Sequence, residues 1–374
     1  MDLAFCLIKY FPFGGLQRDF LRIAELCHGK GHQIDVYTPE WLGDVPAWLQ
    51  LNLLKVDGFT NHARRLSFSR KLAQAVALKK YDAVVGFSKM PGLDLYYAAD
   101  SCFAAKIEKR NFCYRHSARC RTYLDLERAV FERKSPTLIL MLSENEKHLY
   151  QKYFQTQEER LLLLPPGISR DRLRPPDAAR LREELRAELG IGEADYMVLM
   201  VGSGFKTKGA DRALRALAAL PEALRAKSFL VVIGKDNFAP FRQMAKRLRV
   251  SEKVLFFDGR SDIIRFLVAA EVLIHPAYKE NTGTVLLEAM AAQLPVLTTE
   301  VCGYSGHIKN ANAGVVLSSP FRQTELNDVL ADMLVSAYRK NWMTNAADYV
   351  RRVDLFSMPE KAAEVIINVA EARG

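Results

Sequence analysis

The chain has 374 residues, 49% of them hydrophobic and 26% charged, and carries a net charge of +10 at pH 7. This length is too great for one ordinary core and predicts two domains of about 150 to 200 residues each. Because charges interrupt every apolar stretch before the ~20 residues that span a bilayer, the sequence argues against a transmembrane protein. The start Met1-Asp2 lacks the basic region of a signal peptide, so we expect a cytoplasmic protein.

The first part of the chain alternates apolar strands with helices and loops, the order expected of a parallel α/β sheet. The expected strands are 2–8, 33–38, 81–87, 95–100, 137–143 and 161–164, and the best-defined helix is 16–29. Pro165-Pro166-Gly167 then opens a charged connector. We therefore place the first domain at 1–165.

Small and acidic residues follow the first strands. Gly14 and Gly15 come after strand 2–8, at the end of the sheet where ligands of α/β proteins bind, and glycine lets a backbone approach a ligand closely. A simple tight turn is the alternative. Asp19 is placed in the first turn of the next helix, where it can balance the helix dipole. Asp100 ends a later strand and is expected to face the cleft between the domains.

A basic segment, residues 102–134, contains nine lysines and arginines against four acids, half of the net charge of the chain. Aromatic residues such as Phe112, Tyr114 and Tyr123 are interleaved with the charges. This pattern fits an element that lies on an anionic membrane surface, and a solvated basic face is the equally weighted alternative. Nucleic acid is not expected as a partner, because no known nucleic-acid-binding motif is present.

Cysteines and histidines give no sign of a metal site. The six cysteines include no C-x-x-C pair, and the seven histidines are not clustered. Reduced thiols are therefore expected rather than disulfides or zinc ligands.

The second half begins a new α/β pattern. Its expected strands are 196–202, 229–234, 254–257, 271–274 and 295–299. Residues 203–209 form a loop between a strand and a helix, but they match neither a Walker A nor a Rossmann motif. Lys206 and Lys208 in this loop can reach phosphates, although exposed loop lysines are usually only solvated. We place the second domain at 166–353, followed by a C-terminal helix, 354–374, that crosses back to the first domain.

One stretch, 275–288, carries the clearest functional pattern, because it runs from a buried strand through a loop into a helix. Thr282 is the expected N-cap, and the amides of Gly283 and Thr284 are then available to a phosphate at the helix N-terminus. Glu280 in the loop and Glu288 in the helix lie on either side of that anion. Each ionised carboxylate can accept two hydrogen bonds from a vicinal diol. A nucleotide-sugar offers a diol on each side of its diphosphate, although a bare Glu-x7-Glu often arises by chance.

With these motifs, the sequence resembles the lipopolysaccharide core glucosyltransferases, retaining enzymes of the GT-B fold in glycosyltransferase family four. The segments that carry the resemblance are 9–20, 89–94, 164–168, 294–299 and 301–304. The resemblance implies two Rossmann-like doubly wound domains that face each other across a deep cleft. It implies transfer of a hexose, glucose above all, from a UDP-sugar to an inner-core heptose of lipid A-core at the cytoplasmic face of the inner membrane. The UDP-sugar is a co-substrate, and neither metal nor cofactor is expected.

The resemblance also implies roles for individual residues. Glu280 would bind the donor sugar hydroxyls, Glu288 the ribose, and Lys208 the diphosphate. The backbone at Gly14-Gly15 and at Gly283-Thr284 would contact the phosphates. Arg260 would lie near the uracil, and Asp19 and Asp100 would line the acceptor side. The basic segment corresponds to the membrane-contacting region of the family.

Two departures from the family pattern concern the donor sugar. Thr207-Lys208 stands where glucosyl-transferring members have Arg-Lys, which leaves Lys206 as a possible substitute cation, and Asn281-Thr282 replaces small residues. The alternative donor is therefore a UDP-N-acetylhexosamine. Three competing functions are a nucleotide-sugar epimerase, a sugar phosphorylase, and a non-enzymatic nucleotide-binding protein docked on membranes.

Overall fold

The computed structural model describes residues 1–12, 14–108 and 110–373, so Phe13 of the loop 9–15 and Lys109 of the basic segment lie outside the described residues. The chain forms two compact units. The first comprises Met1–Gly167 and Ser357–Gly374, and the second comprises Ile168–Phe356. The second unit thus ends three residues beyond the expected limit of 353. Each unit has its own parallel sheet, and the predicted fold class of two Rossmann-like α/β domains is confirmed.

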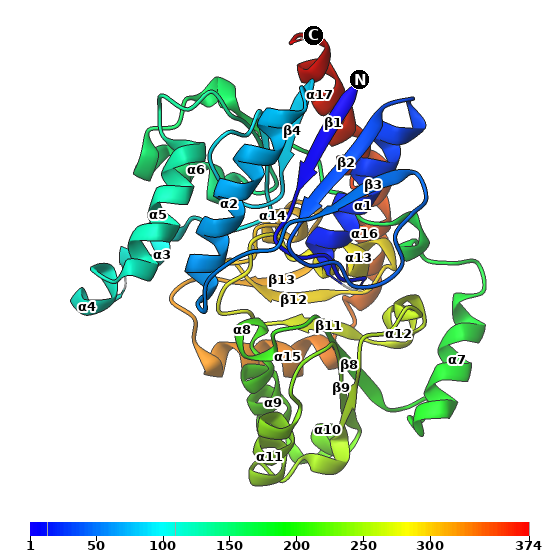
Figure 1. Ribbon diagram of the computed structural model, residues 1–374. Coiled ribbons are helices and arrows are strands. Elements are labelled where there is room, and N and C mark those ends of the chain that lie inside the picture. The colour runs from blue at the N-terminus through cyan, green and yellow to red at the C-terminus, as the bar shows by residue number, and fades with distance from the viewer. Residues whose placement is uncertain (13, 109, 374) are drawn as a thin grey trace. The chain divides into compact units, whose positions relative to one another are not determined.

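The first unit is built on a seven-stranded parallel sheet in the order β3-β2-β1-β4-β5-β6-β7. Figure 1 labels its first four strands, β3, β2, β1 and β4. Side chains of β1 alternate between two buried clusters, because successive residues of a strand point to opposite faces. The strands are β1 (Asp2–Cys6), β2 (Gln33–Thr38), β3 (Leu49–Leu53), β4 (Ala83–Gly86), β5 (Leu95–Ala98), β6 (Leu138–Met141) and β7 (Leu161–Leu163). The helices are α1 (Gly15–Gly29), α2 (Asn61–Leu78), α3 (Phe103–Glu108), α4 (Phe112–Arg115), α5 (Ala118–Phe131), α6 (Glu144–Phe154) and α17 (Met358–Glu371).

Helix α17 belongs to the first unit although it comes at the end of the chain. It lies beside α1 and β4 (Figure 1). Ala363, Ile366 and Ala370 are part of the same buried cluster as Phe5 and Phe20. The C-terminal helix therefore completes a core that the N-terminal residues begin.

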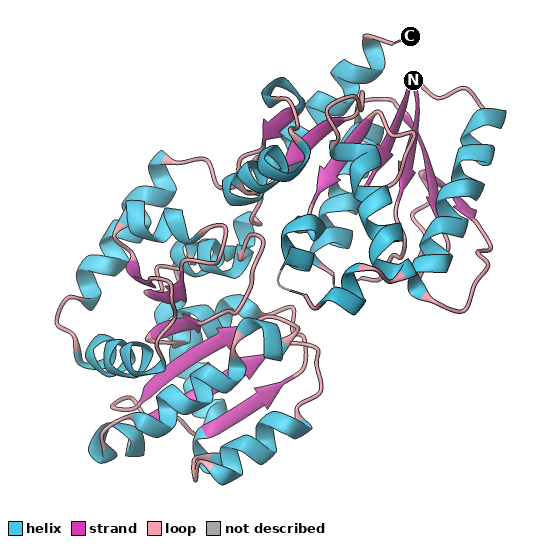
Figure 2. Cartoon of the chain, turned by 90° about the vertical axis from the view of Figure 1, so that its left-hand side faces the viewer, coloured by secondary structure: helices cyan, strands magenta, loops and turns pink. Residues whose placement is uncertain are grey.

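The second unit is built on a six-stranded parallel sheet in the order β10-β9-β8-β11-β12-β13, with helices packed on it (Figure 2). The strands are β8 (Tyr196–Val201), β9 (Ser228–Ile233), β10 (Val254–Phe257), β11 (Val272–His275), β12 (Val296–Thr299) and β13 (Gly314–Leu317). The helices are α7 (Ala178–Leu189), α8 (Phe205–Lys208), α9 (Ala210–Ala219), α10 (Glu222–Ala226), α11 (Ala239–Arg247), α12 (Ile263–Ala269), α13 (Thr284–Ala291), α14 (Ser305–Ala311), α15 (Gln323–Val335) and α16 (Arg339–Arg352). Residues 203–209, expected as a loop, thus contain the one-turn helix α8.

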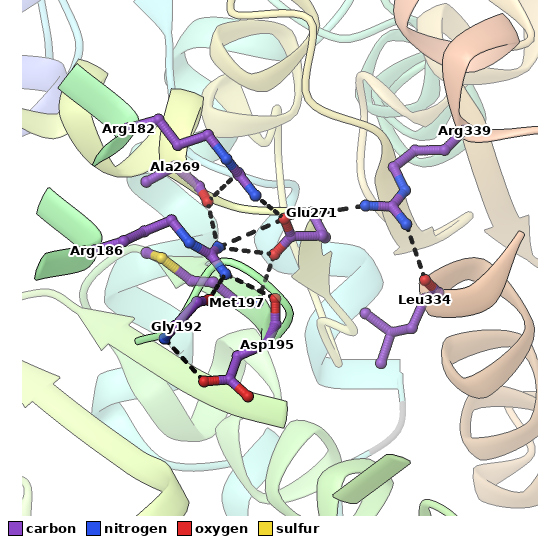
Figure 3. A network of polar contacts seen from close by, with 9 residues as sticks. All are labelled: Arg182, Arg186, Gly192, Asp195, Met197, Ala269, Glu271, Leu334 and Arg339. Atoms are coloured by element: carbon purple, nitrogen blue, oxygen red, sulfur yellow. Dashed lines mark hydrogen bonds and ion pairs between the residues drawn. The ribbon is translucent and has the colours of Figure 1, made fainter. Parts of the chain in front are cut away.

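A buried carboxylate fastens α7 to the amino end of the second sheet (Figure 3). Glu271, just before β11, accepts hydrogen bonds from Arg182 and Arg186 of α7, and its Oε2 also accepts from the N–H of Met197 at 2.6 Å. Arg186 donates as well to the carbonyls of Gly192 and Asp195, at 2.6 and 2.7 Å. This network is at the end of the sheet opposite to the carboxyl ends of its strands. It stabilises the unit and leaves the opposite edge for a ligand.

In the part of the chain that the structure describes, no helix combines the length and the apolar character that crossing a bilayer requires.

Candidate functional site

The two central strands of the second sheet define where a ligand site is expected. β8 pairs with β11, with Val198 opposite Val272, while β9 flanks β8 and β12 flanks β11. The chain thus winds away in opposite directions from this pair, and ligands of open α/β sheets bind at the carboxyl ends of such strands. Lys208 follows β8 and Glu280 follows β11. The topology therefore brings these two predicted residues to one edge of the sheet.

Glu280 is held in place on both carboxylate oxygens, and only 11% of its side chain is exposed. Its backbone pairs with Cys302 in an isolated parallel bridge. Oε1 accepts a hydrogen bond from the N–H of Asn281 at 3.1 Å, and Oε2 contacts both the ammonium of Lys208 and, at 3.3 Å, Nε2 of His275. A carboxylate has about four acceptor positions, so this one retains room for a ligand hydroxyl.

Lys208 is a poorly hydrated cation. Its side chain is 21% exposed, and it forms an ion pair with Glu280. Burial lowers the pKa of Lys208 from its ordinary value, because the charged ammonium gives up water on leaving the solvent. Electrostatic attraction is stronger where water is scarce, so an anion such as a diphosphate would interact strongly at this position. Such an anion would compete with Glu280 for Lys208.

The turn that carries Lys208 touches the loop that carries Glu280. Gly209 has φ +83, and a Cβ at this position would lie 2.1 Å from the carbonyl oxygen of Pro276. The N–H of Tyr278 donates to the carbonyl of Thr207 at 2.9 Å. Glycine is required here both for its backbone angle and for this close approach. The two loops therefore form one connected structure.

Arg212, which the sequence did not single out, secures the same connection from within α9. Its guanidinium donates to the carbonyls of Pro276 and Ala277, each at 3.0 Å. It also lies 3.5 Å from the ring centre of Tyr278 and 3.6 Å from that of Phe321. A signal was available: Arg212 is four residues before Ala216 and so falls on the apolar face of the helix.

His275 is a second residue near Glu280 that the sequence did not single out. It ends β11 and is 1% exposed. Burial, together with the charge of Lys208, lowers the pKa of His275 to about 3, so its ring is neutral at pH 7. The only sequence signal was its place as the last residue of a buried strand, directly before Pro276.

The N-terminus of α13 differs by one residue from the expectation. The N-cap is Gly283 and not Thr282, and its φ of +82 is in the left-handed region that favours glycine. The first amides of a helix have no partner within it, and Thr284 begins this helix. Glu288, further along α13, is buried and lies 3.8 Å from Nε of Arg172.

Lys206 and Arg260 also follow strands of the second sheet but are less enclosed. Lys206 is exposed in α8 and makes no ion pair with any described residue. Arg260, after β10, donates two hydrogen bonds of 2.7 Å to the carboxylate of Asp262, which raises the pKa of Arg260. A ligand that uses the guanidinium edge of Arg260 would have to replace Asp262.

The candidate residues of the first unit are on different elements. Gly14 is the N-cap of α1 and Gly15 is its first residue, after β1. Asp19 is in the second turn of α1, not the first, and its Oδ2 accepts from the hydroxyl of Tyr97 at 2.9 Å. Asp100 is exposed, two residues beyond the end of β5. Tyr97 in β5 thus links Asp19 to the strand that leads to Asp100.

The basic segment forms three helices, α3 to α5, and one of its acids is buried. Glu127 of α5 is 0% exposed and accepts a hydrogen bond from Lys89 at 2.5 Å. It also accepts from the N–H groups of Phe103 and Ala104, which begin α3. Because Lys89 neutralises Glu127 in the interior, the remaining basic side chains dominate the surface of the segment. Phe112 of α4 is 75% exposed among them.

No group of three or more histidine, cysteine, aspartate or glutamate side chains within the described ranges is arranged to hold a metal ion.

Two family models match most of the chain between them. Residues 13–172 match Glycosyltransferase Family 4, and residues 181–349 match Glycosyl transferases group 1. The chain is 46% identical over 368 residues to lipopolysaccharide glucosyltransferase WaaG of Escherichia coli strain K12, and the match covers 98% of each chain. It is 29% identical over 197 residues to a D-inositol 3-phosphate glycosyltransferase of Streptomyces scabiei, a match that covers 50% of this chain and 43% of the relative.

Solved structures give the same picture of the fold. A crystal structure of WaaG, described as a glycosyltransferase involved in lipopolysaccharide biosynthesis, superposes with a TM-score of 0.92 at 46% identity, over 97% of this chain and 99% of that one. HepE of Anabaena in complex with UDP and glucose superposes with a TM-score of 0.74 over 98% of this chain and 100% of that one. At 17% identity, the second likeness concerns the fold alone.

Proposed function

The chain belongs to the WaaG family of glycosyltransferases, and on that premise we propose that it transfers a hexose, most readily glucose, from a UDP-sugar to an inner-core heptose of lipopolysaccharide. The observation that carries the donor half is the contact of Lys208 with Glu280 at the carboxyl ends of β8 and β11. The acceptor half rests on the relative, whose name specifies lipopolysaccharide.

In this proposal, each site residue binds a different group of the donor. Lys208 and the amides at the start of α13 bind the diphosphate, because a cation and a helix N-terminus both favour negative charge. Glu280 binds hydroxyls of the hexose. Glu288 binds the ribose diol, with Arg172 beside it. Lys206 and Arg260 are less enclosed and contribute to the phosphate and uracil contacts.

We propose that the reaction retains the configuration of the anomeric carbon. The bond between that carbon and the diphosphate oxygen breaks, and its electron pair leaves with UDP. The acceptor hydroxyl attacks from the same face, and its proton passes to a phosphate oxygen of the departing UDP. Lys208 stabilises the negative charge that develops on the diphosphate, in the manner of an oxyanion site. Asp19 and Asp100 of the first unit are proposed to bind acceptor hydroxyls.

We further propose that the reaction needs no metal ion, since Lys208 and the helix amides supply the positive charge that a divalent cation supplies elsewhere. Turnover should then be the same with excess chelator as with added Mg²⁺ or Mn²⁺. A loss of turnover with chelator that is restored by either metal would contradict this part of the proposal.

The proposed place of action is the cytoplasmic face of the inner membrane, reached through residues 102–134. Arg115, Arg128 and Arg133 line a hollow of about 650 Å³ between this segment and α6, and because Glu108 and Glu132 line it too, its positive charge exceeds the negative by one. We expect binding to vesicles that contain anionic lipid, weak binding to neutral vesicles, and release by salt. Reversing the charge of Arg119 and Arg121 should weaken this binding, whereas equal binding to neutral vesicles would argue against it.

The function is tested by incubating the protein with heptosylated lipid A and, in separate reactions, UDP-glucose, UDP-galactose and UDP-N-acetylglucosamine. Mass spectrometry of the lipid should show the added mass of one hexose, with UDP-glucose as the best donor. Added N-acetylhexosamine would identify the alternative donor suggested by Thr207 and by Asn281-Thr282. Formation of an epimeric UDP-sugar from the donor, without an acceptor and without net release of UDP, would favour an epimerase. Donor binding without any product would favour a non-enzymatic protein.

A further inference from the structure

We propose that His275 is a positioning residue for Glu280: its ring, donating from Nε2, fixes the carboxylate for the donor sugar while Lys208 serves the diphosphate. The proposal rests on the function proposed above and adds a residue to it. His275 acts through Glu280 and is not itself a catalytic residue.

The position of the His275 ring is set by the sheet. His275 is opposite Thr298 in the pairing of β11 with β12, and its carbonyl accepts a hydrogen bond from the hydroxyl of Thr298 at 2.9 Å. The side chain is buried, and Nε2 lies 3.3 Å from Oε2 of Glu280. Glu280, by contrast, lies in the loop after β11, where an isolated bridge to Cys302 holds its backbone but not its side chain. The contact therefore ties a loop carboxylate to a strand.

The direction of this hydrogen bond follows from the chemistry of both groups. The ring is neutral, so one nitrogen carries a proton and the other does not. Glu280 pairs with Lys208 and, as an ionised carboxylate, can only accept. We therefore assign the proton to Nε2, which donates to Glu280.

The other ring nitrogen, Nδ1, is destabilising where it lies. Nδ1 of His275 is buried and has no hydrogen-bond partner in the described part of the chain. A buried polar atom without a partner destabilises the fold, because it has lost its hydrogen bonds to water. An apolar side chain would avoid that cost. A histidine at this position is therefore explained by what Nε2–H does for Glu280.

The role of His275 becomes distinct when the donor binds. Oε2 of Glu280 contacts both Lys208 and His275, whereas Oε1 accepts from the N–H of Asn281. A diphosphate draws Lys208 away from Glu280, since both anions compete for one cation. His275 and Asn281 then remain, one donor on each oxygen. Two donors on different oxygens fix the plane of the carboxylate and leave its other lone pairs to the sugar hydroxyls.

The test compares His275→Leu, which removes the donor, with His275→Gln, whose amide N–H can reach the position of Nε2. Steady-state kinetics with UDP-glucose and heptosylated lipid A give kcat and KM, and calorimetry gives the affinities for UDP and for UDP-glucose. For His275→Leu we expect kcat to fall about 10- to 100-fold, the range for a hydrogen bond to a charged group. The affinity for UDP, which has no sugar, should stay within about threefold, and His275→Gln should recover most of kcat.

His307→Leu is the matched control, because His307 is a histidine of the same unit whose Nδ1 lies 2.9 Å from the hydroxyl of Tyr349. It should lower the unfolding temperature and leave kcat within about twofold. The proposal is overturned if His275→Leu keeps its kcat, if it loses UDP affinity by the same factor as kcat, or if His275→Gln is no better than His275→Leu.

Failure of the proposed function has a different signature, namely a wild-type protein that forms no product from any UDP-sugar. The affinities still decide the role of His275 in that case. His275→Leu should lose affinity for UDP-glucose but not for UDP, and an equal change in both would overturn the proposal.

Discussion

Lys208 combines burial and charge at the proposed donor site. Its ammonium is largely withdrawn from water and faces Glu280. Lys208→Ala should lower kcat about 10²- to 10³-fold, the range seen when one donor to a developing anion is removed. The KM for the lipid acceptor should change little, because the lost interaction is with the diphosphate. Steady-state kinetics with each substrate varied in turn measure both effects.

Two other lysines serve as comparisons for Lys208→Ala. Lys235, which follows β9, is exposed at the same edge of the sheet, and Lys235→Ala should leave kcat close to that of the wild type. Lys206→Ala should lower kcat less than Lys208→Ala does, because water screens the charge of an exposed cation. An equal loss of turnover and of acceptor affinity in Lys208→Ala would speak against its role on the diphosphate.

The lowered pKa of His275 leads to a prediction of how the stability of the protein changes at acid pH. Its pKa falls from 6.5 to about 3 on folding, because burial disfavours the charged ring and Lys208 repels it. Between these two values the unfolded chain binds a proton that the folded chain does not. The His275 contribution is therefore intact above pH 6.5, and stability is lost as the pH falls toward 3.

We expect His275→Gln to reduce this acid sensitivity by up to about 1.4 kcal/mol for each pH unit in that range. Urea unfolding of both proteins across the acid range measures it. His32 and His307, whose pKa values burial also lowers, are the same in both proteins, so the difference reports His275. Parallel stability curves for the two proteins would refute the prediction.

At the scale of elements, the sequence predicts strands and helices well where apolar runs are long. It predicts them poorly where tertiary contacts determine the secondary structure. β1, β8 and β11 were predictable from their runs, and the start of α13 was placed within one residue. β13 was missed because it is short and only partly buried. The basic segment breaks into separate helices because Asn111 and Ser117 cap α4 and α5 with their side chains.

The residues of the candidate site also fall into those that the sequence pointed to and those that it did not. Glu280 and Glu288 were singled out because a strand, a glycine and a helix surround them in the sequence, and Lys208 because of the family resemblance; their roles on the donor stay predictions. His275 was not, because nothing in the sequence shows that the loop after β11 folds back onto its ring. Arg212 was not, since it acts on a residue from a different element. The contact of Arg212 with Pro276 joins α9 to the loop after β11. No local pattern specifies a partner so far along the chain.

The contact between the α8–α9 turn and the loop after β11 can be tested at Gly209. Gly209→Ala should destabilise the protein by about 1–3 kcal/mol, because alanine is strained at a positive φ and its Cβ would meet the backbone of Pro276. The free energy of unfolding in urea measures it. Gly306→Ala is the control, since Gly306 is in α14 with open space around it and alanine favours helix. A loss in Gly209→Ala no larger than in Gly306→Ala would mean that the loops can separate freely.

At the scale of the whole molecule, the chain folds into two units, and the first of them is made from two segments that are far apart in the sequence. The first unit takes its sheet from the N-terminal residues and its last helix, α17, from the end of the chain. The second unit is inserted between them as Ile168–Phe356. Each has its own buried clusters on the two faces of its sheet. A change in α17 is therefore expected to affect the first unit.

Ile366→Ala tests this organisation. Ile366 is 0% exposed in the cluster with Phe5 and Phe20, and the substitution should cost about 2–5 kcal/mol as buried contacts are lost and a cavity forms. Hydrogen exchange should speed up in β1, β4, α1 and α17, while the amides of 168–356 keep their protection, because their core is separate. Asn368→Ala, on the exposed side of the same helix, should leave both units unchanged. Equal loss of protection in both units would mean that they unfold as one.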